Sequence, residues 1–483
     1  MSSRTSTARG SDAHTSAPSI VWFRDDLRVA DHPALHAAAE RGAPIVCVYV
    51  LDDASPGIRP LGGAARWWLH HSLEALAASL GELGLELTLR RGAASDVLHS
   101  LVDETGAGAV LWNRRYGEAE RDLDGSIKSS LREAGVEANS HQASLLFEPW
   151  TVLTGQGAPY RVFTPFYRSC LAEPEPRHPL PVVEGLEAHT GVTSDTLDDW
   201  TLLPTTPDWA GGLREAWTPG EKSALERLRH FLRTELSSYV AEQDLPAQDA
   251  TSGLSPYLRW GEVSPFQVWH ETRDYVKSLD RRTAEGAQAA DGAGAFLRQL
   301  VWREFSYHLL FHWPSITHAN MRPAFDEFPW HEATPEIMEA WQQGRTGIPL
   351  VDAGMRELWK TGIMHNRVRM VVASFLVKNL RIDWREGERW FWDTLVDADS
   401  AANSVNWQWV AGSGVDAAPY FRVFNPELQA SKFDPQREYI RRFVDDIDAE
   451  TYPPPLVDLK ESRRQALDAY ATITKDKALG TPG

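Results

Sequence analysis

The chain has 483 residues, of which 42% are hydrophobic, and a formal charge of −18 at neutral pH. This length and composition predict a globular protein with two or three domains. The charge argues against a surface that attracts nucleic acid everywhere, but it allows a local basic patch such as the Arg- and Lys-rich stretch over 345–389. The presence of only two cysteines excludes a disulfide framework and a cysteine-based zinc site, and it fits a reducing compartment.

The sequence predicts neither membrane insertion nor secretion. No apolar run approaches the ~20 residues of a membrane span, and the first residues lack the apolar centre of a secretory signal. Their Ser, Thr and Arg content would also suit a transit peptide. We instead expect a flexible tail over 1–17, a second tail over 476–483, and a cytoplasmic protein.

Residues 18–147 have the pattern of an α/β domain. Four short apolar runs of strand length alternate with Ala- and Leu-rich helical stretches, and these runs are 19–23, 44–51, 85–90 and 109–112. The alternation predicts βαβ units and a parallel sheet buried on both faces, as in a Rossmann-like domain. Because the domain contains neither GxGxxG nor a P-loop, any ligand here would be held by loop side chains.

Residues 148–214 predict a long connector, and residues 215–475 predict an all-helical domain. The connector is rich in Pro, Gly, Asp and Thr, but it contains enough aromatic residues to pack on the domains that it joins. Beyond it, apolar residues recur at helical spacing. We expect helices over 221–244, over 294–313 after a Gly-rich linker, and over 365–380.

Polar groups interrupt the faces of these helices. Gln299, Trp302 and Arg303 share one face at spacings of three and four, as do Asn366 and Met370. Polar positions of this kind in an aromatic-rich helical domain predict an internal ligand cavity. Taken singly, each more often caps or hydrogen-bonds a neighbouring helix.

The segment 397–426 is the most unusual in the chain. It crowds acids, Asn and Trp among small residues and shows little helical or strand periodicity. Small residues let backbone approach a flat ligand, carboxylates accept hydrogen bonds, and Trp adds aromatic surface. The composition predicts, about equally, a cofactor cradle or an Ω-type loop packed by its own side chains.

Six separated motifs, in compatible order and spacing over about residues 19–445, resemble those of the photolyase and cryptochrome family. They are FRDDLRVADHPAL, TSGLSPYLRWG, LVWREF, TGIPLVDAGMREL, MHNRVRMVVASFLVK and DADSAANSVNWQWVAGSGVDAAPYFRVFNP. Within the family, the sequence is most similar to class I cyclobutane pyrimidine dimer photolyases. The resemblance implies an α/β antenna domain, a connector that wraps it, and a helical FAD-binding domain.

The resemblance also implies which residues hold FAD. Asn403 falls where the family places the residue that faces flavin N5, and a neutral amide there supports repair-type chemistry with reduced anionic flavin. Gly253 replaces a residue that is often Arg, which weakens one expected contact on the phosphate side. The residues implied for FAD are Tyr239, Thr251, Ser252, Gly253, Leu254, Ser255, Phe296, Arg303, Arg369, Asp397, Ala398, Asp399 and Asn403.

A photoreduction relay and a lesion pocket are implied in the same way. The relay falls on Trp407, Trp384 and Trp330, whose indoles are readily oxidised. A buried flavin cannot reach a lesion inside the duplex, so the dimer must be flipped out into a pocket. The resemblance implies Trp302 and Trp409 as aromatic walls of this pocket, and Arg367 and Arg422 near DNA phosphates. The other residues implied for the lesion are Gln299, Asn366 and Met370.

Departures from the family pattern bear on the lesion. Gln299 stands where dimer enzymes usually carry a Glu, and Gln is found there in enzymes for 6-4 photoproducts. Those enzymes carry a His pair at the positions of Asn366 and Met370, so we expect a dimer enzyme in which Gln299 still contacts the thymine edge. Ile363 replaces a family Trp beside the flavin.

The antenna chromophore is implied less directly. Gly117, Thr317 and His318 stand where folate-binding members tend to have Glu, Cys and Lys. Arg259 stands where deazaflavin-binding members have a basic residue. These positions favour 8-hydroxy-5-deazaflavin over methenyltetrahydrofolate, and an empty antenna site is the alternative.

Together these features predict a light-dependent DNA repair enzyme. The resemblance implies that light excites reduced FAD, that an electron passes to a flipped-out cyclobutane dimer, and that the electron returns after the ring splits. The alternatives are a 6-4 photoproduct photolyase and a cryptochrome-type photoreceptor, although the sequence after the helical core lacks a long signalling extension. We expect UV-damaged DNA as partner, no metal, no membrane association and a monomer.

Overall fold

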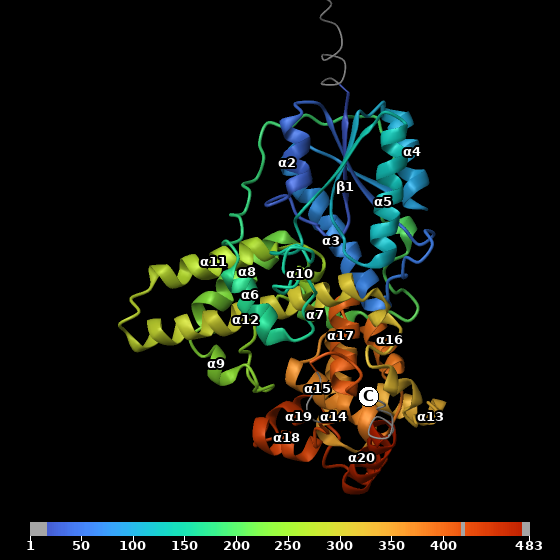
Figure 1. Cartoon of the computed structure of the whole chain (residues 1–483), viewed down its shortest axis with the longest axis vertical. Helices are drawn as coiled ribbons and strands as arrows, with labels where there is room; N and C mark the ends of the chain where they lie inside the picture. The colour runs from blue at the N-terminus through green and yellow to red at the C-terminus, as the bar shows by residue number, and fades with distance from the viewer. Residues whose placement is uncertain (1–16, 417–420, 476–483) are drawn as a thin grey trace, which may run out of the picture.

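The computed structural model describes residues 17–416 and 421–475. Apart from Ala17, both predicted tails therefore lie outside the described residues. Within the described chain, an α/β unit stands above a larger helical unit, as Figure 1 shows. This arrangement confirms the predicted fold class.

The α/β unit contains a five-stranded parallel sheet in the order β3-β2-β1-β4-β5. Each of the four predicted strands is confirmed with bounds shifted by at most two residues. The fifth was not predicted, because its sequence EANSH has no apolar run and buries only Ala138. The strands are β1 (Ser19–Phe23), β2 (Ile45–Leu51), β3 (Leu87–Arg91), β4 (Ala109–Asn113) and β5 (Glu137–His141).

Helices cover both faces of this sheet (Figure 1). Buried residues of α2 and α3 share one core with one face of the strands, and those of α4 and α5 share a second core with the other face. The carboxyl ends of the strands point towards the helical unit, the edge at which open α/β sheets bind ligands. These helices are α2 (Pro33–Glu40), α3 (Gly63–Glu82), α4 (Ala94–Thr105) and α5 (Glu118–Glu133).

The rest of the described chain is helical apart from loops. The connector contains α6 (Phe163–Ala172), a 3-10 turn η1 (Asp198–Trp200) and α7 (Gly211–Ala216). The helical unit contains α8 (Glu221–Thr234), α9 (Tyr239–Glu242), α10 (Ser255–Arg259), α11 (Pro265–Ser278), α12 (Ala284–His312), η2 (Pro314–Thr317), η3 (Pro323–Glu327), α13 (Pro335–Gln342), α14 (Pro349–Thr361), α15 (Asn366–Ser374), η4 (Phe375–Asn379), α16 (Trp384–Thr394), α17 (Ser400–Ala411), α18 (Pro426–Phe433), α19 (Glu438–Phe443) and α20 (Leu459–Lys475). The exact boundaries between the three parts stay predictions.

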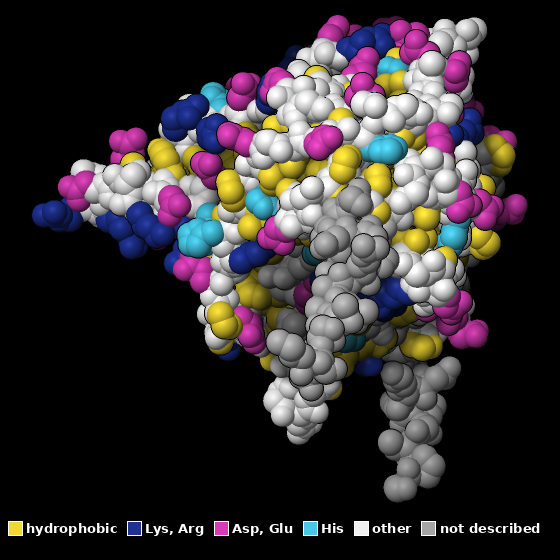
Figure 2. Space-filling model, turned by 90° about the horizontal axis from the view of Figure 1, so that it is seen from above, with side chains coloured by type: hydrophobic (Ala, Val, Ile, Leu, Met, Phe, Trp, Pro, Cys, Tyr) yellow, Lys and Arg dark blue, Asp and Glu magenta, His cyan; other side chains and the backbone are white. Residues whose placement is uncertain are grey.

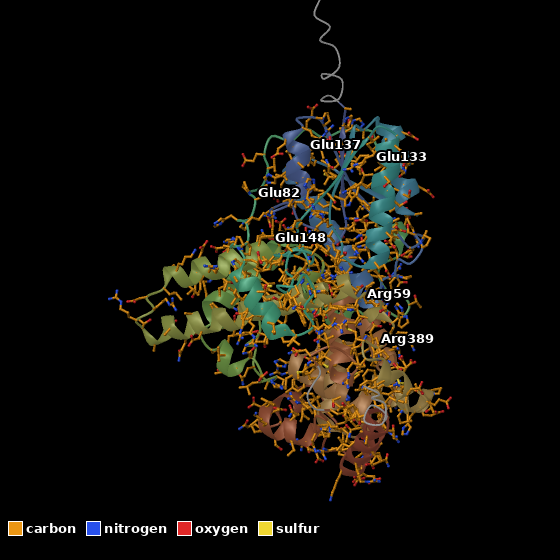
Figure 3. The ribbon with its side chains drawn as sticks, in the orientation of Figure 1. Arg59, Glu82, Glu133, Glu137, Glu148 and Arg389 are labelled. Carbon is orange, nitrogen blue, oxygen red and sulfur yellow. The ribbon has the colours of Figure 1, made fainter. Side chains whose placement is uncertain are left out.

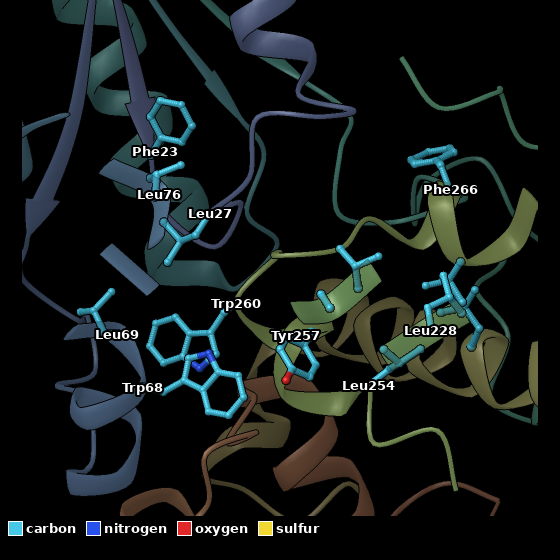
Figure 4. Packing of buried hydrophobic residues seen from close by; sticks show 14 of the residues in the cluster. Phe23, Leu27, Trp68, Leu69, Leu76, Leu228, Leu254, Tyr257, Trp260 and Phe266 are labelled. Atoms are coloured by element: carbon cyan, nitrogen blue, oxygen red, sulfur yellow. The ribbon is translucent and has the colours of Figure 1, made fainter. Parts of the chain in front are cut away.

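One hydrophobic core runs through the junction between the α/β unit and the helical unit. Trp68 of α3 packs edge-on against Tyr257 of α10, with ring centroids 5.3 Å apart, and Trp260 lies in the same cluster (Figure 4). Glu262 is fully buried beside them and accepts hydrogen bonds from Trp68 and Ser72 of α3. Helix α3 of the α/β unit is therefore fixed against the helical unit by both apolar and polar contacts.

Helices α11 and α12 form an arm that projects from the molecule, with Lys and Arg side chains at its tip (Figures 1 and 2). The predicted Gly-rich linker before residue 294 is wrong, because α12 already begins at Ala284. Gly292 of this segment serves close packing instead, because a Cβ on it would lie 1.9 Å from the carbonyl oxygen of Leu236. Gly in a helix costs about 1 kcal/mol relative to Ala, and here it permits that contact.

Two further predicted helices differ from the structure. The helix expected over 221–244 is interrupted between α8 and α9, where the chain turns after Glu235. The helix expected over 365–380 changes from α to π geometry at Phe375. A π turn inserts one extra residue, and such turns are frequent beside functional sites.

Candidate cofactor and substrate site

The core of the site is helix α17, which forms within the segment 397–426 although that segment shows little helical periodicity. Asp399 caps its start by accepting a hydrogen bond from Ala402 N at 2.7 Å, and Gly412 ends it in the left-handed conformation with φ 89°. Buried Lys378 donates to the carbonyl of Ala411 at 2.6 Å and so satisfies one terminal acceptor. Residues 417–420 of the predicted segment lie outside the described residues.

Asp399, Asn403 and Trp407 follow one another at intervals of four and therefore share a face of α17. Asn403 Nδ2 donates to the carboxylate of Glu388 at 2.8 Å and to its backbone oxygen at 3.0 Å. Among the described residues, none donates to Asn403 Oδ1, so the amide presents a bare acceptor. A Cβ on Gly387 would lie 2.1 Å from Trp407 Cη2, so α16 can approach α17 this closely only with Gly there.

Buried polar atoms that lack a hydrogen-bond partner show whether these residues suit FAD. Arg369 holds Asp397 through Nη2 and Oδ2 at 2.9 Å and donates from Nε to Met364 O. The other oxygen of Asp397, Oδ1, is buried and has no hydrogen-bond partner among the described residues, and neither does Trp407 Nε1. A buried acceptor left unpaired costs about 1–3 kcal/mol. A ligand with hydroxyl or ring N–H donors, such as FAD, fits at Asp397.

A second polar group lies at the amino end of α17. Tyr307 donates a hydrogen bond to Asp399, and burial followed by the Asp399 charge raises the pKa of Tyr307 well above its ordinary value. Arg259 donates to Ala398 O at 2.6 Å and to Asp25 of the α/β unit at 2.7 Å. Burial alone would lower the pKa of Arg259, but the neighbouring carboxylates raise it. These contacts fix Ala398 and Asp399 against both units.

The loop predicted to meet the FAD phosphates receives a guanidinium from elsewhere in the chain. Arg227 of α8 donates to Ser252 O at 2.8 Å and to Thr251 O at 3.3 Å. It occupies the space beside Gly253, where a Cβ would lie 2.9 Å from Arg227 Nε. Arg227 therefore supplies at this loop the positive charge that Gly253 itself lacks.

The remaining predicted cofactor residues fall into three places. Phe296 packs near Tyr239, with ring centroids 6.1 Å apart. Arg303 donates to Ser144 O at 2.7 Å and so contacts the end of the α/β unit. Leu254 is buried and Ser255 is exposed at the start of α10.

The three relay tryptophans lie in neighbouring parts of one hydrophobic cluster. Trp407 and Trp384 are buried members, and half-buried Trp330 packs against the cluster. Trp384 Nε1 donates to Asn320 Oδ1 at 2.9 Å. The ring of Trp341 lies edge-on to that of Trp407, with centroids 6.3 Å apart. The order in which these indoles exchange charge stays a prediction.

The predicted lesion residues include two aromatic walls and exposed polar groups. Trp302 stacks on Phe163 of α6, with centroids 3.5 Å apart, and Trp409 donates to Asp416 O at 3.2 Å. Gln299 is exposed one turn before Trp302. The other members are exposed Asn366 and Arg422, together with half-buried Arg367 and Met370.

Arg367 is less available to a phosphate than predicted. Its Nη2 lies 2.6 Å from Asp244 Oδ2, and its guanidinium lies 4.4 Å from the ring centroid of Phe433. Arg422 contacts the ring of Phe424 at 5.9 Å and remains exposed. Of these two arginines, Arg422 is the more exposed.

A cavity lies at the junction, against the carboxyl ends of β1, β2 and β4. Arg259 and Gly117, two of the predicted antenna positions, line it, whereas Thr317 and His318 do not. Two predicted FAD residues, Arg303 and Asp399, form part of its wall. The remaining lining includes Arg24, Asp25, Tyr49, Arg59, Arg115, Tyr116, Tyr307 and Trp392.

Sequence reasoning missed several residues that complete the site. Glu388 holds Asn403, Tyr307 holds Asp399, Arg227 serves the loop at Gly253, and Phe163 stacks on Trp302. Each acts across a contact between segments distant in the sequence. No local pattern marks such a contact.

Comparisons with known proteins agree with this geometry. Residues 19–184 match the model of the DNA photolyase family, and residues 296–450 match that of the FAD binding domain of DNA photolyase. A deoxyribodipyrimidine photo-lyase of Agrobacterium fabrum is 47% identical over 95% of this chain and 98% of its own length. The chain belongs to the photolyase and cryptochrome family.

This photolyase-family chain is also similar to a curated cryptochrome and to a solved photolyase structure. Cryptochrome-2 of Arabidopsis thaliana is 36% identical over 89% of this chain and 70% of its own length. The crystal structure of a bacterial class III photolyase from Agrobacterium tumefaciens superposes with a TM-score of 0.90 at 45% identity, covering 98% of this chain and all of that one. No helix in the described residues combines the length and apolarity needed to cross a membrane.

Proposed function

We propose that this chain is a light-dependent enzyme that splits cyclobutane pyrimidine dimers in UV-damaged DNA. The observation that carries the proposal is the shared face of α17, on which Asp399, Asn403 and Trp407 stand in sequence beside the orphaned acceptor of Asp397. The names of relatives across nearly the full chain support the same activity, and the 47% identity to a photo-lyase exceeds the 36% identity to a cryptochrome.

In this reaction, the chain's own residues would bind FAD and the lesion and orient them. When bound, reduced FAD supplies the electron that opens the cyclobutane ring after light is absorbed. Asp397 would accept from the cofactor through Oδ1, and the bare Oδ1 of Asn403 would accept from flavin N5–H. Trp302, held flat by Phe163, offers a rigid face on which a flipped-out pyrimidine can stack.

Lesion choice is tested by repair of defined substrates. Protein with reduced FAD under blue light is expected to restore a cyclobutane thymine dimer in an oligonucleotide and to leave a 6-4 photoproduct unchanged. Gln299 is the residue that favours a 6-4 photoproduct enzyme. Because dimer enzymes usually carry a Glu at this position, Gln299→Glu should retain dimer repair. Repair of the 6-4 product alone would move the chain to that class, and repair of neither would favour a photoreceptor.

We propose that the chain belongs with the class III photolyases rather than with class I. The support is the match to a class III structure over nearly the whole of both chains.

The junction cavity is proposed as the site of the antenna chromophore. Arg259 lines it, which favours 8-hydroxy-5-deazaflavin, and Gly117 offers no carboxylate to a folate. However, Arg259 already donates to Asp25 and Ala398. Absorption spectra of protein from its native host, followed by release and identification of the chromophores, test this preference.

We also propose that the chain is a monomer and that it acts in the cytoplasm. A monomer acting in the cytoplasm would meet DNA directly, and its two buried thiols fit a reducing compartment. Sedimentation of the purified chain with and without a lesion-containing duplex tests the monomer.

A further inference from the structure

A short segment of the α/β unit lies directly on α16. The indole nitrogen of Trp392 donates to Pro60 O at 2.9 Å, and Gly63 N donates to Asp393 Oδ1 at 2.8 Å. A Cβ on Gly62 would lie 2.3 Å from Trp392 O, so the two backbones touch. These contacts fix residues 60–63, which lead into the start of α3, on the end of α16.

Arg59 extends from this segment into the helical unit. Its two terminal nitrogens donate to the two carboxylate oxygens of Glu388 at 2.7 and 3.0 Å. The guanidinium also lies 4.1 Å from the ring centroid of Trp392. A bidentate, stacked arginine fixes both the plane and the position of the carboxylate that it binds. Figure 3 places Arg59 at the junction, above Arg389 of α16.

Glu388 passes this constraint to Asn403. The carboxylate oxygen Oε1 that accepts from Arg59 also accepts from Asn403 Nδ2, and the backbone oxygen of Glu388 accepts from the same nitrogen. Both bonds therefore direct the NH₂ group of Asn403 towards α16 and leave Oδ1 facing away. Glu388 is 4% exposed, so its charge depends on Arg59 for compensation.

We propose that Arg59 of the α/β unit is a positioning residue for Asn403, acting through Glu388. This inference rests on the proposed function, in which Asn403 faces flavin N5. Arg59 holds the amide in the orientation that presents Oδ1, and it neutralises a carboxylate one hydrogen bond away. Without Arg59, the unpaired Glu388 carboxylate disfavours the negative charge of a reduced flavin.

The test is the midpoint reduction potential of bound FAD in Arg59→Gln, Glu388→Gln and the double variant. Arg59→Gln should weaken the preference for reduced over oxidised FAD by on the order of tenfold, the effect of one unpaired charge at roughly 10 Å in protein. This equals a downward shift of about 30 mV for a two-electron couple. The double variant, which has lost that charge, should return towards the wild-type potential.

Lys222→Gln is the matched control, because Lys222 joins the two units through an ion pair with Glu82 at 2.6 Å but has no link to Asn403. An unchanged potential in Arg59→Gln, in a protein that still binds FAD, overturns the inference and leaves the proposed function intact. Equal shifts in Arg59→Gln and the double variant also overturn it, since only unit packing would then matter. A wild-type chain that binds no FAD refutes the proposed function itself.

Discussion

Glu262 makes the stability of the junction depend on pH. Its carboxyl group is fully buried, where Oε1 accepts from Ser72 Oγ at 2.5 Å and from Gly220 N at 2.7 Å, and Oε2 accepts from Trp68 Nε1 at 3.2 Å. Burial is the largest influence and raises the pKa of Glu262 from 4.5 to about 8, although the three donors oppose it. The folded protein therefore holds a proton that the unfolded chain releases above pH 4.5.

The sign and size of the effect follow from these two values. A group whose folded pKa is raised contributes its stability fully below the unfolded pKa and loses it as pH rises through the folded pKa. Between pH 4.5 and about 8, ionisation of Glu262 should lower the free energy of unfolding by about 1.4 kcal/mol per pH unit, to a total of up to ~5 kcal/mol. Glu262→Gln cannot ionise and should abolish this slope.

The assay is urea unfolding followed by Trp fluorescence from pH 5 to about pH 9. At the low end, Glu262→Gln should be less stable than wild type by about 1 kcal/mol, because one hydrogen bond is poorly made. At the high end it should be the more stable protein, so the two curves cross. Exposed Glu226→Gln on α8 is the matched control and should follow wild type. Parallel curves for Glu262→Gln and wild type would refute the reasoning.

Three further predictions concern the cofactor site. Trp407→Phe should block light-driven reduction of oxidised FAD, measured by flavin absorbance, while repair by chemically reduced enzyme persists; unchanged photoreduction would rule out the relay. Gly387→Ala should cost about 1–3 kcal/mol in unfolding free energy and slow photoreduction, because its Cβ would lie 2.1 Å from Trp407 Cη2; wild-type values for both would contradict the packing. Asp397→Asn should weaken FAD binding roughly 10–100-fold by loss of a charged hydrogen-bond partner, measured by fluorescence titration, and an unchanged Kd would show that Asp397 does not touch FAD.

Burial explains which elements the sequence revealed. Strands β1, β2 and β4 are fully buried on both faces, so each appears as an unbroken apolar run. Helix α17 is also buried nearly all round. Its own buried residues include Ala, Asn, Ser and Gln as well as Trp, so it has no distinct polar face. Without contrast between faces, a helix has no periodicity to detect.

The residues of the site also differ in whether the sequence could locate them. Asp399, Asn403 and Trp407 could be located from the sequence because they belong to one continuous motif whose resemblance fixes each position. Glu388 acts on that motif from another helix, and only its distance to Asn403 reveals it. Arg227 acts in the same way on the separate loop at Ser252. Contacts between distant segments depend on how helices pack, which local sequence does not encode.

The single face of α17 also limits how this protein can change during evolution. From Asp399 to Trp407 the helix rises about 12 Å, and one inserted or deleted residue would rotate everything beyond it by about 100°. Such a change between Asp399 and Asn403 would turn Asn403 away from Glu388 and Trp407 away from Gly387. New properties at this site are therefore expected to arise by substitution at fixed helix length.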